Sequence, residues 1–205
     1  MNILLTGATG YIGSYMLNYL SKNTPIRIIP LCRKLPSYLS SWRNKFEVIE
    51  CDVTKLDELK KEVPKDVDVI IHLAALNDVK SSKNPEQALI VNGLGTRNML
   101  EIAKGTNCKN FIYFSVLQVY GRELNGTLTV DSPIKIENDY TFTHYVAEGY
   151  CRLYSSVHNL NANIIRLSYS FGCPVSPKVD RWTLIPECFC LTAYKKGEIR
   201  LKSSG

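Results

Sequence analysis

The chain has 205 residues, a formal net charge of +6 at pH 7 and 45% hydrophobic residues. This length suggests one domain, or one domain with part of a second, and it is long enough to bury a substantial core. The basic residues form no dense run and acidic residues lie between them, so the composition is typical of a globular protein that does not bind nucleic acid.

The amino-terminal sequence lacks the features of a secretion signal, because Met1 leads almost directly into the short apolar run Ile3–Leu5. No apolar stretch reaches the roughly 18 residues that span a membrane. The seven cysteines are scattered, and the three histidines show no ligand spacing. Reduced thiols and no metal site are therefore expected. We expect a cytoplasmic protein that does not contact a membrane.

Short apolar runs alternate with helical patterns along the chain. The runs expected to be strands are Asn2–Leu5, Ile26–Leu31, Phe46–Ile49, Val67–Leu73, Phe111–Val116 and Asn163–Leu167. Helices are expected at Tyr11–Leu20, Lys55–Val63, Asn84–Lys104, Tyr140–His158 and Glu187–Lys195. Because parallel strands need long crossovers, this alternation predicts an α/β fold with a doubly wound parallel sheet.

Polar residues mark two of the expected helix starts. Thr54 is the expected N-cap of the helix that begins near Lys55. Asn84, followed by Pro85 and Gln87, has the pattern of a capping box. Both assignments support the helix boundaries given above.

A glycine-rich segment joins the first expected strand to the first expected helix, and it reads Thr6-Gly7-Ala8-Thr9-Gly10-Tyr11-Ile12-Gly13. Gly7 permits a tight turn, Gly10 lets the backbone approach a pyrophosphate, and Gly13 lets the helix pack closely. Unpaired amides at the helix start attract the anion. A plain glycine-rich turn is the alternative, but the position inside a βαβ unit favours a dinucleotide site.

The chain resembles the extended branch of the short-chain dehydrogenase/reductase superfamily, the nucleotide-sugar epimerases and dehydratases. The segments that carry the resemblance follow in family order, each given with the family's pattern: Gly7–Gly13 (G-x-x-G-x-x-G), Asp68–Ala75 (D-x-V-x-H-x-A-A), Val91–Thr96 (V-N-x-x-G-T), Phe114–Gly121 (F-S-S-x-x-V-Y-G) and Arg166–Gly172 (R-x-x-x-x-Y/F-G). The resemblance implies a Rossmann fold, NAD or NADP as cofactor, and a nucleotide-sugar substrate. It also allows a homodimer.

The resemblance divides the chain into two parts. Residues 1–172 correspond to the dinucleotide-binding domain, and residues 173–205 correspond to the truncated start of a substrate-binding lobe. Within the second part, Lys196–Gly205 resembles a hairpin that precedes the last strand of the family's sheet. A fragment and a naturally shortened protein are both compatible with this pattern.

The resemblance assigns a set of residues to the cofactor: Gly7, Thr9, Gly10, Tyr11, Ile12, Gly13, Arg33, Asp52, Val53, Leu73, Ala74, Ala75, Asn92, Tyr140 and His144. Arg33 and Lys34 follow the second expected strand without an acid nearby, which favours NADP over NAD because a guanidinium binds a 2′-phosphate. Solvated loop charges are the alternative. Asp52 and Val53 are expected beside the adenine, and a turn or capping role is the alternative for Asp52.

The catalytic motif departs from the family pattern. The family's Y-x-x-x-K pair falls on Tyr140 and His144, so a histidine replaces the lysine. The reactive Ser or Thr position falls on Val116, and Ser115 is the neighbouring hydroxyl. A lysine lowers the pKa of a nearby phenol by its charge, whereas histidine is mostly neutral at pH 7. We expect Tyr140 to be the acid/base, with a pKa near the usual value of about 10 and with His144 and Ser115 beside it.

Two functions are compatible with these residues. The first is an NAD(P)-dependent epimerase, dehydratase or reductase that acts weakly on a nucleotide-activated sugar. The alternative is a catalytically impaired NADP(H)-binding module that serves as a sensor, partner subunit or inactive paralogue. Val116 and His144 favour the binding module. Tyr140, Asn92 and Arg166 favour the enzyme.

Overall fold

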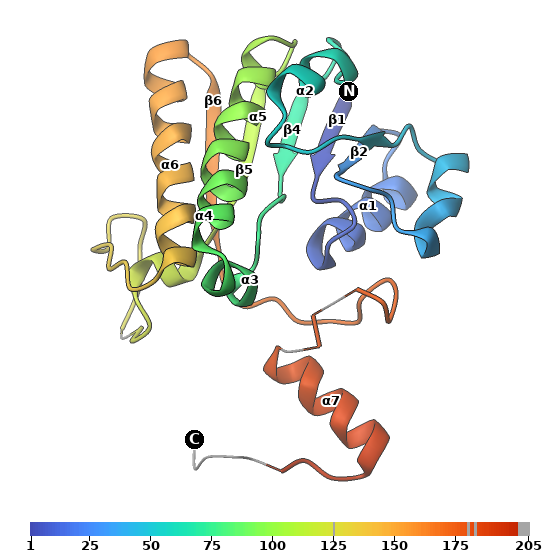
Figure 1. Cartoon of the computed structure of the whole chain (residues 1–205), viewed down its shortest axis with the longest axis vertical. Helices are drawn as coiled ribbons and strands as arrows, with labels where there is room; N and C mark the ends of the chain where they lie inside the picture. Colours follow the sequence, from blue (N-terminus) through green and yellow to red (C-terminus); the bar gives the residue numbers. More distant parts are fainter. Residues whose placement is uncertain (125, 180, 183, 201–205) are drawn as a thin grey trace.

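The structure is a computed structural model that describes residues 1–124, 126–179, 181–182 and 184–200. Its centre is a six-stranded parallel sheet in the order β3-β2-β1-β4-β5-β6 (Figure 1). The strands are β1 (Asn2–Thr6), β2 (Arg27–Cys32), β3 (Ile49–Glu50), β4 (Val69–His72), β5 (Asn110–Val116) and β6 (Asn161–Leu167). The predicted parallel α/β fold is therefore confirmed.

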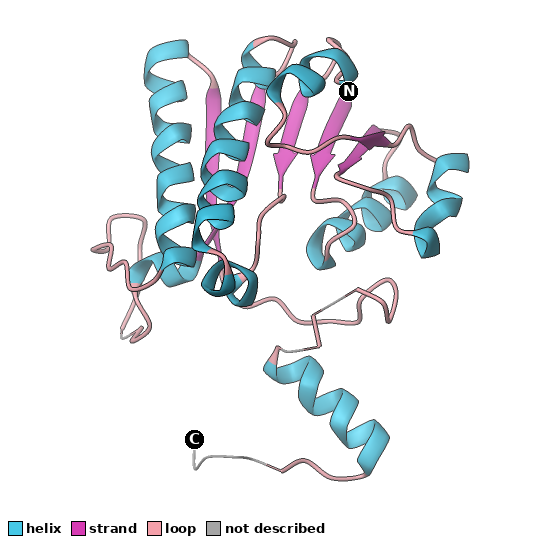
Figure 2. Cartoon of the chain, viewed as in Figure 1, coloured by secondary structure: helices cyan, strands magenta, loops and turns pink. Residues whose placement is uncertain are grey.

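Helices pack on both faces of this sheet (Figure 2). One core lies between the strands and α2 (Leu56–Glu62), α5 (Gly95–Lys104) and α6 (Asp139–His158). A second core lies under α1 (Tyr11–Asn23), where Leu17 packs near Ile3. Since the helices that follow β1 and β4 lie on opposite faces, the winding direction reverses between these adjacent strands. Ligands of such folds bind at that reversal, beyond the carboxyl ends of the strands.

The two faces of β5 have different surroundings. Phe111, Tyr113 and Ser115 are buried on the face covered by α5 and α6. On the opposite face the neighbouring strand β6 is less covered, and Ile165 is 39% exposed. The period-two pattern thus directs Tyr113 and Ser115 towards α6.

The third strand differs from the prediction of Phe46–Ile49, because β3 contains only Ile49 and Glu50. The Phe46 amide donates to the Trp42 carbonyl at 2.8 Å, and the two rings pack edge to face. Trp42 lies within a 3₁₀ segment, η1 (Ser37–Asn44), that the sequence pattern did not reveal. Phe46 therefore belongs to the packing around α1 and not to the sheet.

The start of α2 also corrects the prediction. The helix begins at Leu56, and Thr54 does not cap it. Instead, the Thr54 amide and hydroxyl both donate to Asp52 Oδ1, at 2.9 and 2.8 Å. This turn satisfies Thr54 locally, which removes its hydroxyl from the helix end.

The expected helix Asn84–Lys104 is present but is not uniform. Asn84 accepts a hydrogen bond from the Gln87 amide at 3.1 Å and caps α4 (Pro85–Ala88), as predicted. A π-helical segment, η2 (Leu89–Leu94), then leads into α5. A short unpredicted helix, α3 (Asp78–Lys83), precedes α4. Such π turns are frequent at functional sites.

The chain beyond β6 leaves the sheet and ends in α7 (Ile185–Lys196), close to the predicted Glu187–Lys195. Figure 1 shows α7 beyond the edge of the sheet at which the strands end. Residues 197–200 form no strand, and residues 201–205 of the expected hairpin lie outside the described residues. Within the described part of the chain, no helix combines the length and the apolar character needed to cross a membrane.

Candidate active site

The glycine-rich segment forms a tight loop between β1 and α1. Gly7 has a positive φ of 66°, and a Cβ atom there would lie 2.7 Å from the carbonyl carbon of Leu73. A Cβ atom on Gly13 would lie 2.3 Å from the Gly7 oxygen. Gly10 is the N-cap residue of α1 and offers no side-chain cap. The first-turn amides of this 13-residue helix therefore have no side-chain acceptor at the cap and are available to an anion.

A buried chain of hydrogen bonds fixes the base of this loop. The Thr6 hydroxyl accepts from the Leu73 and Ala74 amides at 3.2 Å, so its own proton goes to His72 Nδ1 at 2.7 Å. His72 Nε2 then donates to Thr96 at 3.1 Å. Burial lowers the pKa of His72 to about 3, so the ring is neutral. His72 is thus a structural residue that joins β1, β4 and α5.

Asn92 lies at the centre of the π-helical segment and is fully buried. Its Oδ1 accepts from the Leu76 amide at 2.7 Å, and its Nδ2 donates to the Thr143 hydroxyl at 3.0 Å. Thr143 is one residue before His144 in α6. Asn92 therefore ties the segment after β4 to the helix that carries the predicted catalytic pair.

Tyr140 and His144 lie together in the first turns of α6. Their ring centroids are 4.8 Å apart with an interplanar angle of 76°. Asn138 fixes the helix start by accepting from the Thr141 amide at 2.9 Å. His144 is 2% exposed, and its Nδ1 lies 2.6 Å from the hydroxyl of Tyr113 on β5. Burial lowers the pKa of His144 to about 4, so this ring is also neutral at pH 7.

These elements meet at one edge of the sheet. The glycine loop follows β1, the Leu73–Ala75 segment follows β4, and Val116 ends β5. A dinucleotide with its pyrophosphate at the start of α1 can therefore extend along the strand ends towards α6. This is the place at which open α/β sheets bind their ligands, at a topological reversal.

The sequence model of the NAD dependent epimerase/dehydratase family matches residues 3–203. The chain belongs to this family. It is 30% identical over 196 residues to the low-salt glycan biosynthesis protein Agl12 of Haloferax volcanii, covering 91% of this chain and 61% of Agl12. It is 28% identical to the dTDP-D-glucose 4,6-dehydratase of Dictyostelium discoideum, of which it spans 46%. The chain thus spans less than two thirds of either relative.

Solved structures of the epimerase/dehydratase family have the same fold. The UDP-glucuronic acid 4-epimerase of Bacillus cereus, in complex with NAD, superposes with a TM-score of 0.79 at 25% identity and covers 95% of this chain. The UDP-glucose 4-epimerase of Thermotoga maritima, with UDP-glucose, gives a TM-score of 0.85 at 21% identity. This chain covers 63% and 67% of those two structures.

Ser115, which was expected beside Tyr140, has its hydroxyl in a different hydrogen-bond network. It donates to Glu148 Oε1 at 2.7 Å, and Glu148 also accepts from Arg166 at 2.9 and 2.8 Å. Glu148 is completely buried. Burial raises its pKa, but the hydrogen bonds from Arg166, Ser115 and Arg152 outweigh this effect and lower the pKa below its usual value. Ser115 thus supports α6 from inside the core.

Tyr140 differs from the prediction in its acidity. Burial raises its pKa to about 12, although the charge of Arg181 lowers it and that of Asp78 raises it. The expectation of a pKa near the free value neglected this desolvation. Arg181, whose charge acts on Tyr140, comes from a distant loop whose position no local sequence pattern reveals.

The residues predicted near the adenosine end have mixed surroundings. Arg33 and Lys34 are exposed beyond the end of β2, as required for contact with a ligand. Glu50 on β3 lies beside Cys32 and accepts from the Leu35 amide at 2.9 Å. An acid is therefore near the end of β2 after all, supplied by the neighbouring strand.

Asp52 and Val53 have structural roles in the described contacts. Asp52 forms the turn with Thr54, as in the alternative considered for it. Val53 is 6% exposed, and its carbonyl accepts from Asn98 at 3.0 Å.

A contact that sequence reasoning missed joins α7 to the glycine loop. The Tyr11 hydroxyl lies 2.9 Å from Glu187 Oε1 and 2.8 Å from the Gly172 carbonyl. The Gly172 amide donates to the same Glu187 oxygen at 3.1 Å. Glu187 is the buried residue of α7, and it anchors this helix at the site.

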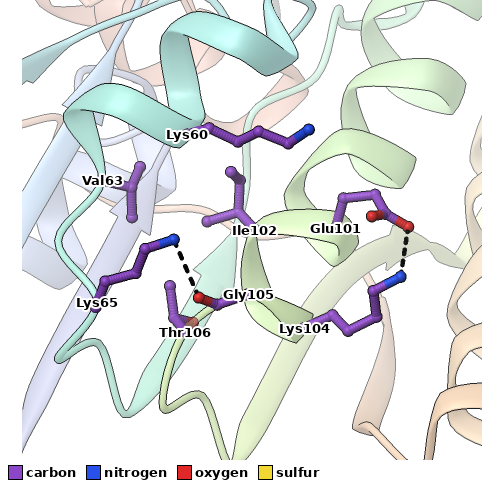
Figure 3. Close-up of a pocket in the computed structure, with 8 residues that line it drawn as sticks. All are labelled: Lys60, Val63, Lys65, Glu101, Ile102, Lys104, Gly105 and Thr106. Atoms are coloured by element: carbon purple, nitrogen blue, oxygen red, sulfur yellow. Dashed lines mark hydrogen bonds and ion pairs between the residues drawn. The ribbon is translucent and has the colours of Figure 1, made fainter.

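A hollow of about 230 Å³ lies elsewhere, between the ends of α2 and α5 (Figure 3). Lys65 donates to the Gly105 carbonyl at 3.2 Å, and Lys104 pairs with Glu101 at 3.3 Å. Cations near helix carboxyl ends stabilise the helix dipole. These lysines therefore place positive charge at the carboxyl ends of α2 and α5, at the edge of the sheet opposite the glycine loop.

Proposed function

We propose that this chain is the dinucleotide-binding part of an enzyme that epimerises, dehydrates or reduces a nucleotide-activated sugar. The observation that carries the proposal is the position of the anion-binding start of α1 and of the Tyr140–His144 pair at one edge of the sheet. The relatives named above support it, since their names describe chemistry on nucleotide sugars. Residues 173–205 would then begin the substrate-binding lobe.

The residues present fit a nicotinamide dinucleotide. Cβ atoms at Gly7 and Gly13 would fill the loop, and His144 Nε2 is a buried polar atom with no partner among the described residues. When bound, NAD or NADP supplies the hydride acceptor and donor. The start of α1 would bind the pyrophosphate and Leu73–Ala75 would border it, whereas the buried Asn92 would act indirectly by holding Leu76 and Thr143. Thr9, Tyr11 and Ile12 complete the loop.

Tyr140 would transfer the proton to or from the substrate oxygen. With a pKa of about 12 the phenol is protonated at pH 7, which suits an acid and makes it a slow base. We expect the rate of a step that needs the phenolate to rise tenfold per pH unit from about pH 7 to 10. Introducing a charge by His144→Lys, with Val116→Thr to restore a hydroxyl, should increase hydride transfer and shift this profile to lower pH.

The assay is nicotinamide absorbance with a panel of nucleotide sugars, using the chain and also any longer form that the gene encodes. Tyr140→Phe should remove turnover. Turnover that survives Tyr140→Phe would refute this role. Dinucleotide binding without turnover in every form would instead support the binding module, which the engaged Ser115 hydroxyl and the apolar Val116 favour.

NADP is the cofactor that the exposed cations Arg33 and Lys34 favour. A charge-assisted contact is worth roughly 1.5–3 kcal/mol, or about ten- to a hundredfold in affinity. Titration calorimetry should therefore show tighter binding of NADPH than of NADH, and Arg33→Ala should remove the difference. The carboxylate of Glu50 accepts from the Leu35 amide and pairs with Arg43, so its negative charge is balanced and does not prevent the binding of a 2′-phosphate. Equal affinities in the unaltered chain would contradict it.

A homodimer is also proposed. Exposed apolar side chains gather on α6 and the adjacent η2: Leu89, Ile90, Leu94, Phe142, Tyr145, Leu153 and Val157. Sedimentation equilibrium should show a dimer that Leu153→Glu dissociates. Val130→Glu, at a position 83% exposed in a loop, is the control. A monomeric unaltered chain would exclude this assembly.

A further inference from the structure

His144 and His72 are both buried and neutral, but their hydrogen bonding differs. His72 has a partner on each ring nitrogen, Thr6 on Nδ1 and Thr96 on Nε2. His144 has Tyr113 on Nδ1 at 2.6 Å. Its Nε2 is buried and has no hydrogen-bond partner among the described residues. His144 therefore has one ring nitrogen that is hydrogen-bonded within the protein and one without a partner among the described residues.

The hydrogen bond to Tyr113 decides which nitrogen carries the proton. Burial raises the pKa of Tyr113 well above its usual value, so the phenol keeps its proton. Burial also keeps the imidazole neutral, with a single N–H. The Tyr113 hydroxyl lies 2.6 Å from His144 Nδ1, and the Thr96 hydroxyl that is also near it already donates to the Asn92 carbonyl and accepts from His72. The phenol therefore donates to Nδ1, and the imidazole proton resides on Nε2.

An N–H buried without an acceptor destabilises a folded chain, so a ligand that accepts from Nε2 would complete the bonding of His144. The Nε2 atom belongs to the ring that packs against Tyr140, on α6. The pyrophosphate is assigned to the start of α1, so the part of the dinucleotide that reaches α6 is a nucleoside. The hydroxyls of its ribose are uncharged oxygens that can accept from a neutral N–H.

We propose that Tyr113 is a positioning residue that holds His144 in the Nε2–H tautomer, so that this N–H donates to a ribose hydroxyl of the bound dinucleotide. The proposal rests on the proposed function for its ligand, but the tautomer is a property of the chain alone. Tyr113 acts through His144 and does not itself contact the ligand. In this chain a fixed hydrogen-bond donor would take the position that a flexible lysine has in the family pattern.

The tautomer can be measured directly on the chain labelled with ¹⁵N-histidine. Long-range ¹H–¹⁵N correlation spectra at pH 7 should show the His144 ring as the Nε2–H tautomer, with the signal assigned by its loss in His144→Gln. Tyr113→Phe keeps the ring and removes the donor, so the His144 signals should move towards the Nδ1–H form. The signals of His72 should stay unchanged.

Tyr154→Phe is the matched control, because Tyr154 is also buried but its hydroxyl contacts Glu101 and not His144. Titration with NADH and NADPH supplies the second measurement. Tyr113→Phe should weaken the tighter-binding dinucleotide roughly three- to tenfold, the range of one neutral hydrogen bond. Tyr154→Phe should not weaken it. Unfolding curves verify that both variants are folded.

An Nδ1–H tautomer in the unaltered chain, or spectra that Tyr113→Phe leaves unchanged, would overturn the proposal. Unchanged dinucleotide affinity in Tyr113→Phe, with a shifted tautomer, would overturn the contact with ribose. If the unaltered chain binds neither dinucleotide, the proposed function fails, while the spectra still decide the role of Tyr113. The two failures are therefore distinguishable.

Discussion

Replacing Glu148 with glutamine should lower the free energy of unfolding by about 3 kcal/mol. Glu148 has a fully buried side chain, and that of Arg166 is 13% exposed. Removing the carboxylate charge leaves the guanidinium of Arg166 without its partner, and breaking a buried pair in this way costs roughly 3–5 kcal/mol. We take the lower end because part of Arg166 is solvated. The half-exposed Arg152 adds little.

Urea unfolding at pH 7, followed by circular dichroism, measures this loss. A chain of this size should also melt on the order of 6–12 °C lower. Since the folded pKa of Glu148 is lowered, its contribution to stability is present above the unfolded pKa of about 4.3 and is lost as the pH falls through the folded pKa. The difference between the two proteins should therefore shrink in acid.

Arg152→Gln is the control, because it removes a cation from the same carboxylate at an exposed position. Its effect should stay below about 1 kcal/mol. A loss in Glu148→Gln that matches this control would refute the reasoning. So would a difference that persists undiminished in acid, since the carboxylate would then not be the source of the stability.

Two further perturbations test the loop and α7. Gly13→Ala places a Cβ atom 2.3 Å from the Gly7 oxygen and should abolish dinucleotide binding in calorimetry, whereas Gly149→Ala, with open space around it in α6, should stabilise the fold by up to about 1 kcal/mol. Wild-type affinity in Gly13→Ala would contradict the assigned loop. Glu187→Ala removes the acceptor of Tyr11 and Gly172 and should accelerate amide hydrogen exchange throughout α7. Unchanged exchange there would show that other contacts hold this helix.

The order of elements could be predicted from the sequence because each strand and helix has its own apolar period. The exceptions have tertiary causes. Phe46 is as apolar as a strand residue, but it packs beside Trp42 near α1. Asn92 lies in an ordinary helical pattern, and the π-helical turn around it is visible only with its bonds to Leu76 and Thr143.

The candidate site could be predicted where chain spacing determines it. Tyr140 and His144 are four residues apart in one helix and therefore meet. The same rule adds Glu148 to that face, and the alternation of β5 adds Tyr113 and Ser115 opposite it. This signal was present in the sequence and would have placed the Ser115 hydroxyl in the core. No sequence spacing places Arg181 near Tyr140 or Glu187 near Tyr11, because both residues follow the last strand and reach the site only through the tertiary fold.

The two edges of the sheet have unequal capacity to pair with another strand. β3 ends the sheet on one side with two residues, too short to offer a continuous row of backbone groups. β6 ends it on the other side with seven residues, in register with β5 along its whole length. An edge strand of this length is a template for a further strand, whether from the same chain or from another molecule. A further strand can therefore pair with the sheet along β6 but not along β3.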